Sequence, residues 1–290
     1  MAVLLVAALA AASLPAAAQR YFNNPISQYY RDGYLWNPAL AGNEGTRIYG
    51  LLNKSWIGFE GAPRQINIAG DMKIGESSGA GIQLISDKSG VFQRYMGAVS
   101  YAYVARLSEV NRLRIGGDLS FYQERLDNSA LTSEGQVDLS GKSFNDKGME
   151  FNGDLGAVFE GSRLSLGVTA YNLRSYLEKA GERSADIAIG QALASYKFKC
   201  GDDEKITLQP MMAYKIYYKH SDILTAAMQL EYEEVFHVGV YWQNTGNAMG
   251  GLGLMLKDMG EINFFYSGKN KQGYNQQYEV GLKLKIKKAG

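Results

Sequence analysis

The chain of 290 residues is poor in the side chains on which most enzyme chemistry depends. It has one cysteine and two histidines. One cysteine excludes a disulfide framework and a multi-cysteine zinc site, and two histidines leave little material for metal binding or nucleophilic catalysis. The 30 basic residues are balanced by 29 acidic ones, so no basic field that would attract nucleic acid is present. These shortages favour a protein that works by binding.

Common catalytic motifs are also missing. The sequence has no G-x-S-x-G, P-loop, H-E-x-x-H or EF-hand pattern. His220 and His237 have no partner in a nucleophile motif, and Ser221 is a chance neighbour of His220 because adjacent side chains rarely point at each other. We therefore predict no enzyme activity, no cofactor and no metal site. A hydrolase is the weakest hypothesis for this chain.

Proline is scarce, with 5 residues, whereas glycine (34) and tyrosine (20) are abundant. Mean hydropathy is −0.23 although 46% of the residues are apolar. This mixture suits a β-rich protein with many turns and many aromatic side chains that keep one polar end. After residue 18 no run of 18 apolar residues occurs, so any contact with a membrane would involve a barrel or a peripheral surface.

The first 18 residues resemble a signal peptide. An apolar stretch covers residues 3–14 and is followed by Pro15 and by small residues up to Ala18. This order is typical of an h-region and an A-x-A cleavage site, so we predict that the mature chain starts at Gln19.

Alternating apolar and polar residues predict strands along the rest of the chain. In residues 278–286, Val280, Leu282 and Leu284 share one face, whereas Glu279 and Lys283 share the other. The other predicted strands cover residues 47–54, 65–74, 79–86, 93–107, 112–124, 150–160, 163–172, 188–198, 205–215, 224–232, 235–243, 248–256 and 261–267. These fourteen segments, an even number, are mostly long enough for tilted membrane-spanning strands.

The links between these strands alternate in length. Every second link is short, and these are residues 75–78, 108–111, 161–162, 199–204, 233–234 and 257–260. The remaining links include the longer segments 55–64, 125–149, 173–187 and 268–276. Short periplasmic turns and longer outer loops are typical of outer-membrane barrels.

The residue types on the two strand faces favour a barrel whose apolar outer face contacts lipid. The polar faces are rich in glycine, which suits a narrow interior, and closure of so many strands removes exposed edges. Aromatic residues near the strand ends predict interfacial girdles, formed by Tyr49, Trp56, Tyr103, Tyr122, Tyr171, Tyr196, Trp242 and Tyr266. We predict an all-β fold, an antiparallel transmembrane barrel of about 14 strands. A large soluble β-sandwich or solenoid is the alternative.

These patterns divide the chain into three parts. We predict a signal peptide at 1–18, an extended periplasmic N-terminal segment at 19–45 that is tucked into the barrel or along its mouth, and the outer-membrane barrel at 46–290. Within the segment, Asn37-Pro38-Ala39 before Ala41-Gly42 is a turn signal.

The first predicted outer loop is rich in aromatic residues and glycine. It reads Trp56-Ile57-Gly58-Phe59-Glu60-Gly61-Ala62-Pro63. Such a loop either packs inward as a structural element or contacts a partner, and the two readings have equal weight. The candidate partner-binding residues are Asn37, Pro38, Trp56, Phe59, Gly61, Ala62 and Pro63.

These motifs, in this order, resemble the PorP/SprF family of type IX secretion system membrane proteins of Bacteroidetes. The resemblance rests on Ser27-Gln28-Tyr29-Tyr30, Asn37-Pro38-Ala39-Leu40-Ala41-Gly42, Trp56-x-Gly58-Phe59-x-Gly61-Ala62-Pro63-x-Gln65, Gly79-Ala80-Gly81-Ile82-x-Leu84, Asp87-x-x-Gly90 and Ser100-Tyr101-Ala102-Tyr103. It implies an outer-membrane protein that anchors or helps deliver secreted proteins with a C-terminal sorting domain, including gliding-motility adhesins in some relatives. It also implies contact with the lipid bilayer and with periplasmic secretion-machinery proteins.

A channel for hydrophobic small molecules is the alternative function. Fatty-acid channels are similar in having fourteen strands and an inward N-terminal segment, but their chains are longer and carry a hatch domain. Uptake of ligand into liposomes would separate this hypothesis from docking.

Overall fold

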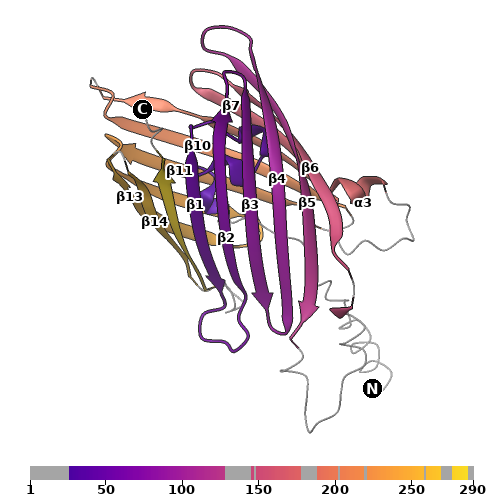
Figure 1. Ribbon diagram of the computed structural model, residues 1–290. Helices are drawn as coiled ribbons and strands as arrows, with labels where there is room; N and C mark the ends of the chain where they lie inside the picture. Colours follow the sequence, from indigo (N-terminus) through magenta and orange to yellow (C-terminus); the bar gives the residue numbers. More distant parts are fainter. Residues whose placement is uncertain are drawn as a thin grey trace, which may run out of the picture.

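The computed structural model describes residues 26–127, 145–146, 148–177, 188–201, 203–218, 221–257, 259–268 and 276–286. In these residues antiparallel strands follow one another in chain order, and β1 pairs with β15, so the sheet closes into a barrel (Figure 1). The strands are β1 (Arg47–Ser55), β2 (Arg64–Ile74), β3 (Ser78–Ser89), β4 (Phe92–Arg106), β5 (Arg112–Leu126), β6 (Glu150–Glu160), β7 (Leu164–Tyr171), β8 (Ile189–Tyr196), β9 (Phe198–Cys200), β10 (Ile206–Tyr217), β11 (Ile223–Tyr232), β12 (Phe236–Gln243), β13 (Ala248–Leu256), β14 (Gly260–Ser267) and β15 (Gln277–Lys285).

The barrel has fourteen strands because β8 and β9 are two parts of one interrupted strand. Both pair with β10, but β9 pairs only as far as Leu208 and β8 only from Met211. Pro210 lies between these positions and has no backbone N–H to donate to the ladder. The carbonyl of Gln209 accepts a hydrogen bond from the Tyr30 hydroxyl at 2.8 Å. The predicted fourteen-stranded barrel is confirmed, with one break that the strand pattern does not predict.

The two ends of the barrel differ in the length of their links. At one end, the short-turn end, every link has three to five residues: 75–77, 107–111, 161–163, 201–205, 233–235 and 257–259. At the opposite end, the long-loop end, the links are 56–63, 90–91, 127–149, 172–188, 218–222, 244–247 and 268–276. The predicted alternation holds for the links 56–63, 127–149, 172–188 and 268–276, whereas 90–91, 218–222 and 244–247 are no longer than the turns at the opposite end.

The outer face is apolar and the inner face is polar. Leu119 on β5 is 73% exposed, and Val168 and Val240 are also exposed, whereas Asn67, Thr169 and His237 point inward and are buried. This distribution is the inverse of a soluble β-sandwich and is that of a barrel surrounded by lipid. Among the described residues no helix is long and apolar enough to cross a membrane.

The predicted aromatic girdle is only partly present. Trp56, Tyr103, Trp242 and Tyr266 are exposed as expected. For three other members the prediction is wrong, because they occupy inward positions of their strands, where the phenol group binds polar partners. These lumenal residues are Tyr49, Tyr122 and Tyr171, which donate to Gln28, Glu150 and the carbonyl of Trp36 respectively.

Candidate functional site

Residues 26–46 fill part of the barrel interior, and we call them the plug. They form three short 3-10 helices, η1 (Ile26–Gln28), η2 (Gly33–Leu35) and η3 (Pro38–Leu40). The side chains of Asp32 and Asn37 cap η2 and η3 by accepting hydrogen bonds from the backbone of Tyr34 at 3.1 Å and Ala39 at 2.9 Å. The prediction that the N-terminal segment is extended is therefore wrong for residues 26–45: local capping and Pro38, whose fixed φ suits the first helical position, fold them into turns.

Glycines in the barrel wall make room for the plug. A β-carbon on Gly116 would lie 2.6 Å from the Cα of Ala39, and one on Gly156 would overlap the side chain of Asn37. The Asn37 amide instead donates to the carbonyl of Val168 at 3.0 Å. The glycines of the polar strand faces thus allow close approach of the plug backbone.

An ionic cluster holds Arg31 of the plug to β14. Arg31 and His237 both contact one carboxylate oxygen of Glu261, each at 2.9 Å. The Lys283 amine donates to the carbonyl of Arg31 at 2.7 Å. Arg31, His237 and Glu261 are nearly completely buried, so removal of one partner would leave an uncompensated charge in the interior.

A second cluster joins the plug to β1 and β2. The Arg47 guanidinium contacts Asp71 through two nitrogens, at 2.9 and 3.1 Å, and lies 3.4 Å from Asp32. Asp71 also accepts the backbone N–H of Gly42 at 2.6 Å. Burial raises the pKa of Asp32 to about 6, although Arg47 opposes this shift. Acidification below about pH 6 would therefore protonate Asp32 and weaken its attraction to Arg47.

A third set of contacts surrounds Glu279 on β15. Its carboxylate accepts hydrogen bonds from Gln28 at 2.9 Å and Asn53 at 3.0 Å, and from Ser27. The three sets together attach the plug to β1, β2, β14 and β15. The plug is therefore a fixed part of the barrel interior rather than a loosely packed tail.

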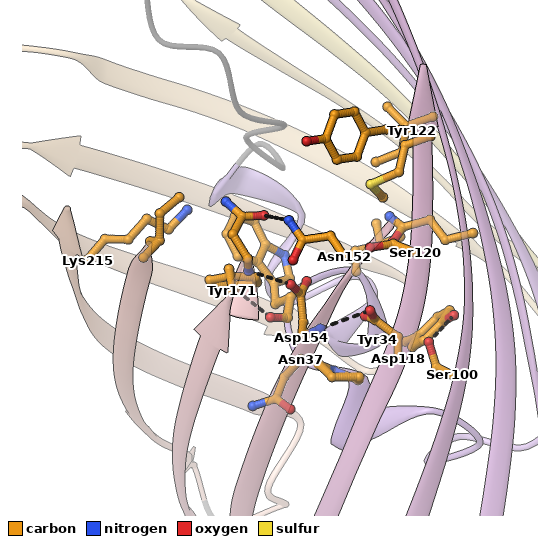
Figure 2. A pocket seen from close by; sticks show the side chains of 18 residues that line it. Tyr34, Asn37, Ser100, Asp118, Ser120, Tyr122, Asn152, Asp154, Tyr171 and Lys215 are labelled. Atoms are coloured by element: carbon orange, nitrogen blue, oxygen red, sulfur yellow. Dashed lines mark hydrogen bonds between the residues drawn. The ribbon is translucent and has the colours of Figure 1, made fainter. Parts of the chain in front are cut away.

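On its other side the plug borders a pocket in the lumen with a volume of about 60 Å³. Tyr34 and Trp36 of the plug contribute aromatic walls, and β5 and β6 contribute Asp118 and Asp154 (Figure 2). In Figure 2 Lys215 from β10 lies on the opposite side of the pocket from Asp118. We call this space the lumenal pocket.

The two carboxylates of the lumenal pocket come from directly paired positions of β5 and β6. Asp118 accepts the backbone N–H of Asp154 at 3.1 Å, and Asp154 accepts that of Asn172 at 2.8 Å. The Lys215 ammonium lies 5.2 Å from the ring centre of Trp36 and 5.7 Å from that of Tyr171, which are cation–π distances. The pocket therefore combines acidic groups, a cation and aromatic rings on one small surface.

The sequence comparison decides the family. Residues 18–282 match the family model described as type IX secretion system membrane protein PorP/SprF. The chain belongs to the PorP/SprF family. The resemblance inferred from the sequence motifs is thereby confirmed, and the protein is a component of the outer membrane. No curated protein matches this PorP/SprF sequence.

Solved structures similar to this PorP/SprF protein are outer-membrane barrels. The CymD monoaromatic hydrocarbon channel aligns with 87% of this chain and 91% of its own, at 11% identity and a TM-score of 0.52. The Ralstonia pickettii toluene transporter TbuX covers 88% and 93%, at 10% identity and a TM-score of 0.51. The Acinetobacter baumannii protein Omp33 covers 83% and 98%, at 7% identity and a TM-score of 0.51. At such low identity these likenesses show the fold.

The candidate partner-binding residues of the PorP/SprF chain occupy two places. Asn37 and Pro38 are buried in the plug and line the lumenal pocket. The other five lie in the link between β1 and β2, where Trp56 and Phe59 are 45% and 55% exposed. These five are Trp56, Phe59, Gly61, Ala62 and Pro63. The carbonyl of Gly61 accepts the N–H of Gly90 at 2.8 Å, which ties this loop to the turn between β3 and β4.

Sequence reasoning missed the charged members of the lumenal pocket. Asp118, Asp154 and Lys215 all lie within predicted strands, at positions that alternate with lipid-facing residues. A charge at an inward position of a barrel strand is the signal that marks them. His237, assessed only as a catalytic candidate, has a structural role beside Glu261, whereas His220 lies outside the described residues.

Proposed function

We propose that this protein is a non-enzymatic outer-membrane docking component of the type IX secretion system. It would anchor, or help deliver, secreted proteins with a C-terminal sorting domain, among them gliding adhesins in some relatives. Family membership over residues 18–282 is the observation that carries this proposal. The attached plug supports it, because passage of a polypeptide through the lumen would first require breaking the buried ion pairs of Arg31 with Glu261 and of Asp32 with Arg47.

The orientation of the barrel assigns each end a role. Outer-membrane barrels have short periplasmic turns, so the short-turn end would face the periplasm and the secretion machinery there. The long-loop end, with the exposed Trp56 and Phe59, would face the cell surface and the cargo. Exposed aromatic side chains on a loop are suited to partner contact. A signal peptide at 1–18 and an N-terminal segment at 19–45 remain part of this proposal, with residues 1–25 outside the described residues.

Surface display of a reporter fused to a C-terminal sorting domain tests the proposal. Deletion of residues 128–144, within the longest predicted outer loop, should reduce display while the purified barrel keeps its heat-modifiable migration on a gel. These residues lie outside the described part of the chain. The control is deletion of residues 270–274 in the last outer loop. Unchanged display in a strain that lacks the whole gene would refute the proposed function.

A channel for hydrophobic small molecules is the competing function, and the inward plug with its Asn-Pro-Ala turn is the observation that favours it. The polar lining of the lumenal pocket, with Asp118, Asp154 and Lys215, disfavours it. Toluene uptake into liposomes that contain the purified protein, at a rate above that of empty liposomes, would support this channel function against docking.

A further inference from the structure

We propose that a second pocket, at the short-turn end of the lumen, binds an aspartate or glutamate side chain of a periplasmic protein, with Arg163 and Lys197 as the groups that pair with it. This pocket has a volume of about 190 Å³ and lies between the plug and the strands β6, β7 and β8. We call it the mouth pocket. The inference rests on the proposed function and deepens it, because it names the chemistry by which the short-turn end would recognise its partner.

The first feature of the mouth pocket is a pair of cations that lie opposite each other on two strands. The backbone N–H of Lys197 donates to the carbonyl of Arg163 at 2.9 Å, one position beyond the paired residues Leu164 and Tyr196. Directly opposite residues of an antiparallel ladder share one face of the sheet. Both side chains line the mouth pocket, and like charges in such positions repel each other. A carboxylate bound between them would offset this repulsion.

Two hydroxyl groups extend this donor surface into the pocket. Ser165 and Ser195 are the directly opposite pair two positions further along the same strands, so they share the face of the two cations. Both serines line the mouth pocket, and the hydroxyl oxygen of Tyr29 from the plug lies 3.4 Å from Ser195 Oγ. Two cations and two hydroxyl groups at four neighbouring positions suit the two oxygens of a carboxylate.

The second feature is that the carboxylates around the mouth pocket already have cations of their own. These ion pairs are Glu160 with Arg114 at 2.6 Å, Glu44 with Arg47 at 2.6 Å, and Glu204 of the neighbouring turn with Lys199. Arg163 and Lys197 form no ion pair with any residue in the described part of the chain. The two positive charges of the pocket are therefore left for a ligand, and the ligand that they attract is an anion.

The third feature is the position and size of the mouth pocket. Arg163 belongs to the link 161–163 at the short-turn end, and the side chains of Arg163 and Lys197 are exposed. Ser195, deeper in the pocket, is buried on the lumenal side of the wall, so a lipid headgroup held in the bilayer would not enter there. A volume of about 190 Å³ is far more than one water molecule needs and admits the end of a side chain. An acidic side chain of a protein at the short-turn end combines the required charge and reach.

Titration calorimetry with the purified full chain in neutral detergent micelles tests the proposal directly. The probes are acetyl-Gly-Asp-Glu-Gly-amide, its neutral counterpart acetyl-Gly-Asn-Gln-Gly-amide, and inorganic phosphate. We expect saturable binding of the acidic peptide, about tenfold weaker binding of the neutral peptide, and a loss of affinity for the acidic peptide as the salt concentration rises. Equal binding of the two peptides would overturn the proposal. Binding of inorganic phosphate as tight as that of the acidic peptide would indicate a general anion site and would also overturn it.

Two double variants and a matched control separate pairing in the pocket from general loss of charge. Arg163→Gln with Lys197→Gln should weaken binding of the acidic peptide about tenfold without changing heat-modifiable migration. The control is Arg106→Gln with Arg112→Gln, because these arginines are also directly opposite each other at the short-turn end but do not line the mouth pocket. It should bind the acidic peptide like the parent chain.

Reversal of the charges gives a gain of binding as an independent test. Arg163→Glu with Lys197→Glu should lose the acidic peptide and bind acetyl-Gly-Lys-Lys-Gly-amide, which the parent chain should not bind. This result cannot come from a chain that fails to fold. Parent affinity of the glutamine double variant for the acidic peptide, or equal losses in that variant and its control, would contradict the assignment of the two cations.

Surface display distinguishes this inference from the proposed function. If loss of the gene abolishes display of the sorting-domain reporter while the glutamine double variant preserves display, the assignment of the mouth pocket to a periplasmic partner fails and docking stands. If loss of the gene leaves display intact, docking itself fails. A fall in both display and peptide affinity in the glutamine double variant, with neither changed in the Arg106 and Arg112 control, supports both.

Discussion

Replacement of Glu261 by glutamine should release the plug. In the described structure Glu261 is the ion-pair partner of Arg31, with 2.9 Å between Arg31 Nη1 and Glu261 Oε1, and both side chains are almost fully buried. The amide of glutamine keeps the shape but removes the charge, so Arg31 stays in the interior without a counter-charge. Removal of one partner of a buried ion pair costs about 3–5 kcal/mol. Since 1.4 kcal/mol is a factor of ten, the ratio of seated to released plug should fall by about two to three and a half orders of magnitude.

Single-channel conductance in a planar bilayer measures this release. The parent protein should be closed for nearly all of the recording, and Glu261→Gln should show frequent openings. Glu204→Gln is the matched control, because the Lys199–Glu204 pair is about half exposed on both sides and such surface pairs are worth about 0–1 kcal/mol. The double variant Arg31→Met with Glu261→Leu removes both charges and should restore closure in part. Conductance of Glu261→Gln indistinguishable from that of the parent would refute the assignment of this ion pair as an anchor.

Two further changes test the wall of the barrel. Gly156→Ala places a methyl group where the Asn37 side chain lies, and overpacking of this kind costs about 1–3 kcal/mol. The urea concentration at the midpoint of plug release, followed by Trp36 fluorescence, should therefore fall. Gly190→Ala is the control, because its methyl group meets no atom within 4 Å and should leave this midpoint unchanged. Leu119→Arg puts a charge on a lipid-facing position that is 73% exposed. It should lower the stability of the folded barrel by about 2–4 kcal/mol and reduce the yield of folding into vesicles. Leu107→Arg, in a short turn, is the control and should lower the stability by about 0–1 kcal/mol. Equal midpoints for the two glycine variants, or equal yields for the two leucine variants, would contradict the respective assignment.

The barrel could be predicted because each strand carries its own pattern. Alternation at positions such as Val280, Leu282 and Leu284 is local information, and every strand repeats it independently of its neighbours. The break between β8 and β9 could not be predicted in the same way. Its cause, Pro210, lies on the neighbouring strand, and only the pairing register shows which residues face it.

The aromatic residues show where local reasoning fails. A tyrosine near a strand end suits a lipid interface and suits a polar lumen equally well. Tyr103 faces outward, whereas Tyr49 is completely buried and donates to Gln28 of the plug. The inward or outward position in the strand decides between the two environments, and the residue type alone does not.

The sequence by itself determined the fold class, the number of strands, the lengths of the links and the family, because these depend on short-range periodicity and on ordered motifs. The tertiary structure decided what lies in the lumen. Arg31 meets Glu261, and Asn37 meets Gly156, across more than a hundred residues of chain. These contacts exist only after the barrel closes through β1 and β15, since strand register and closure depend on all the strands together.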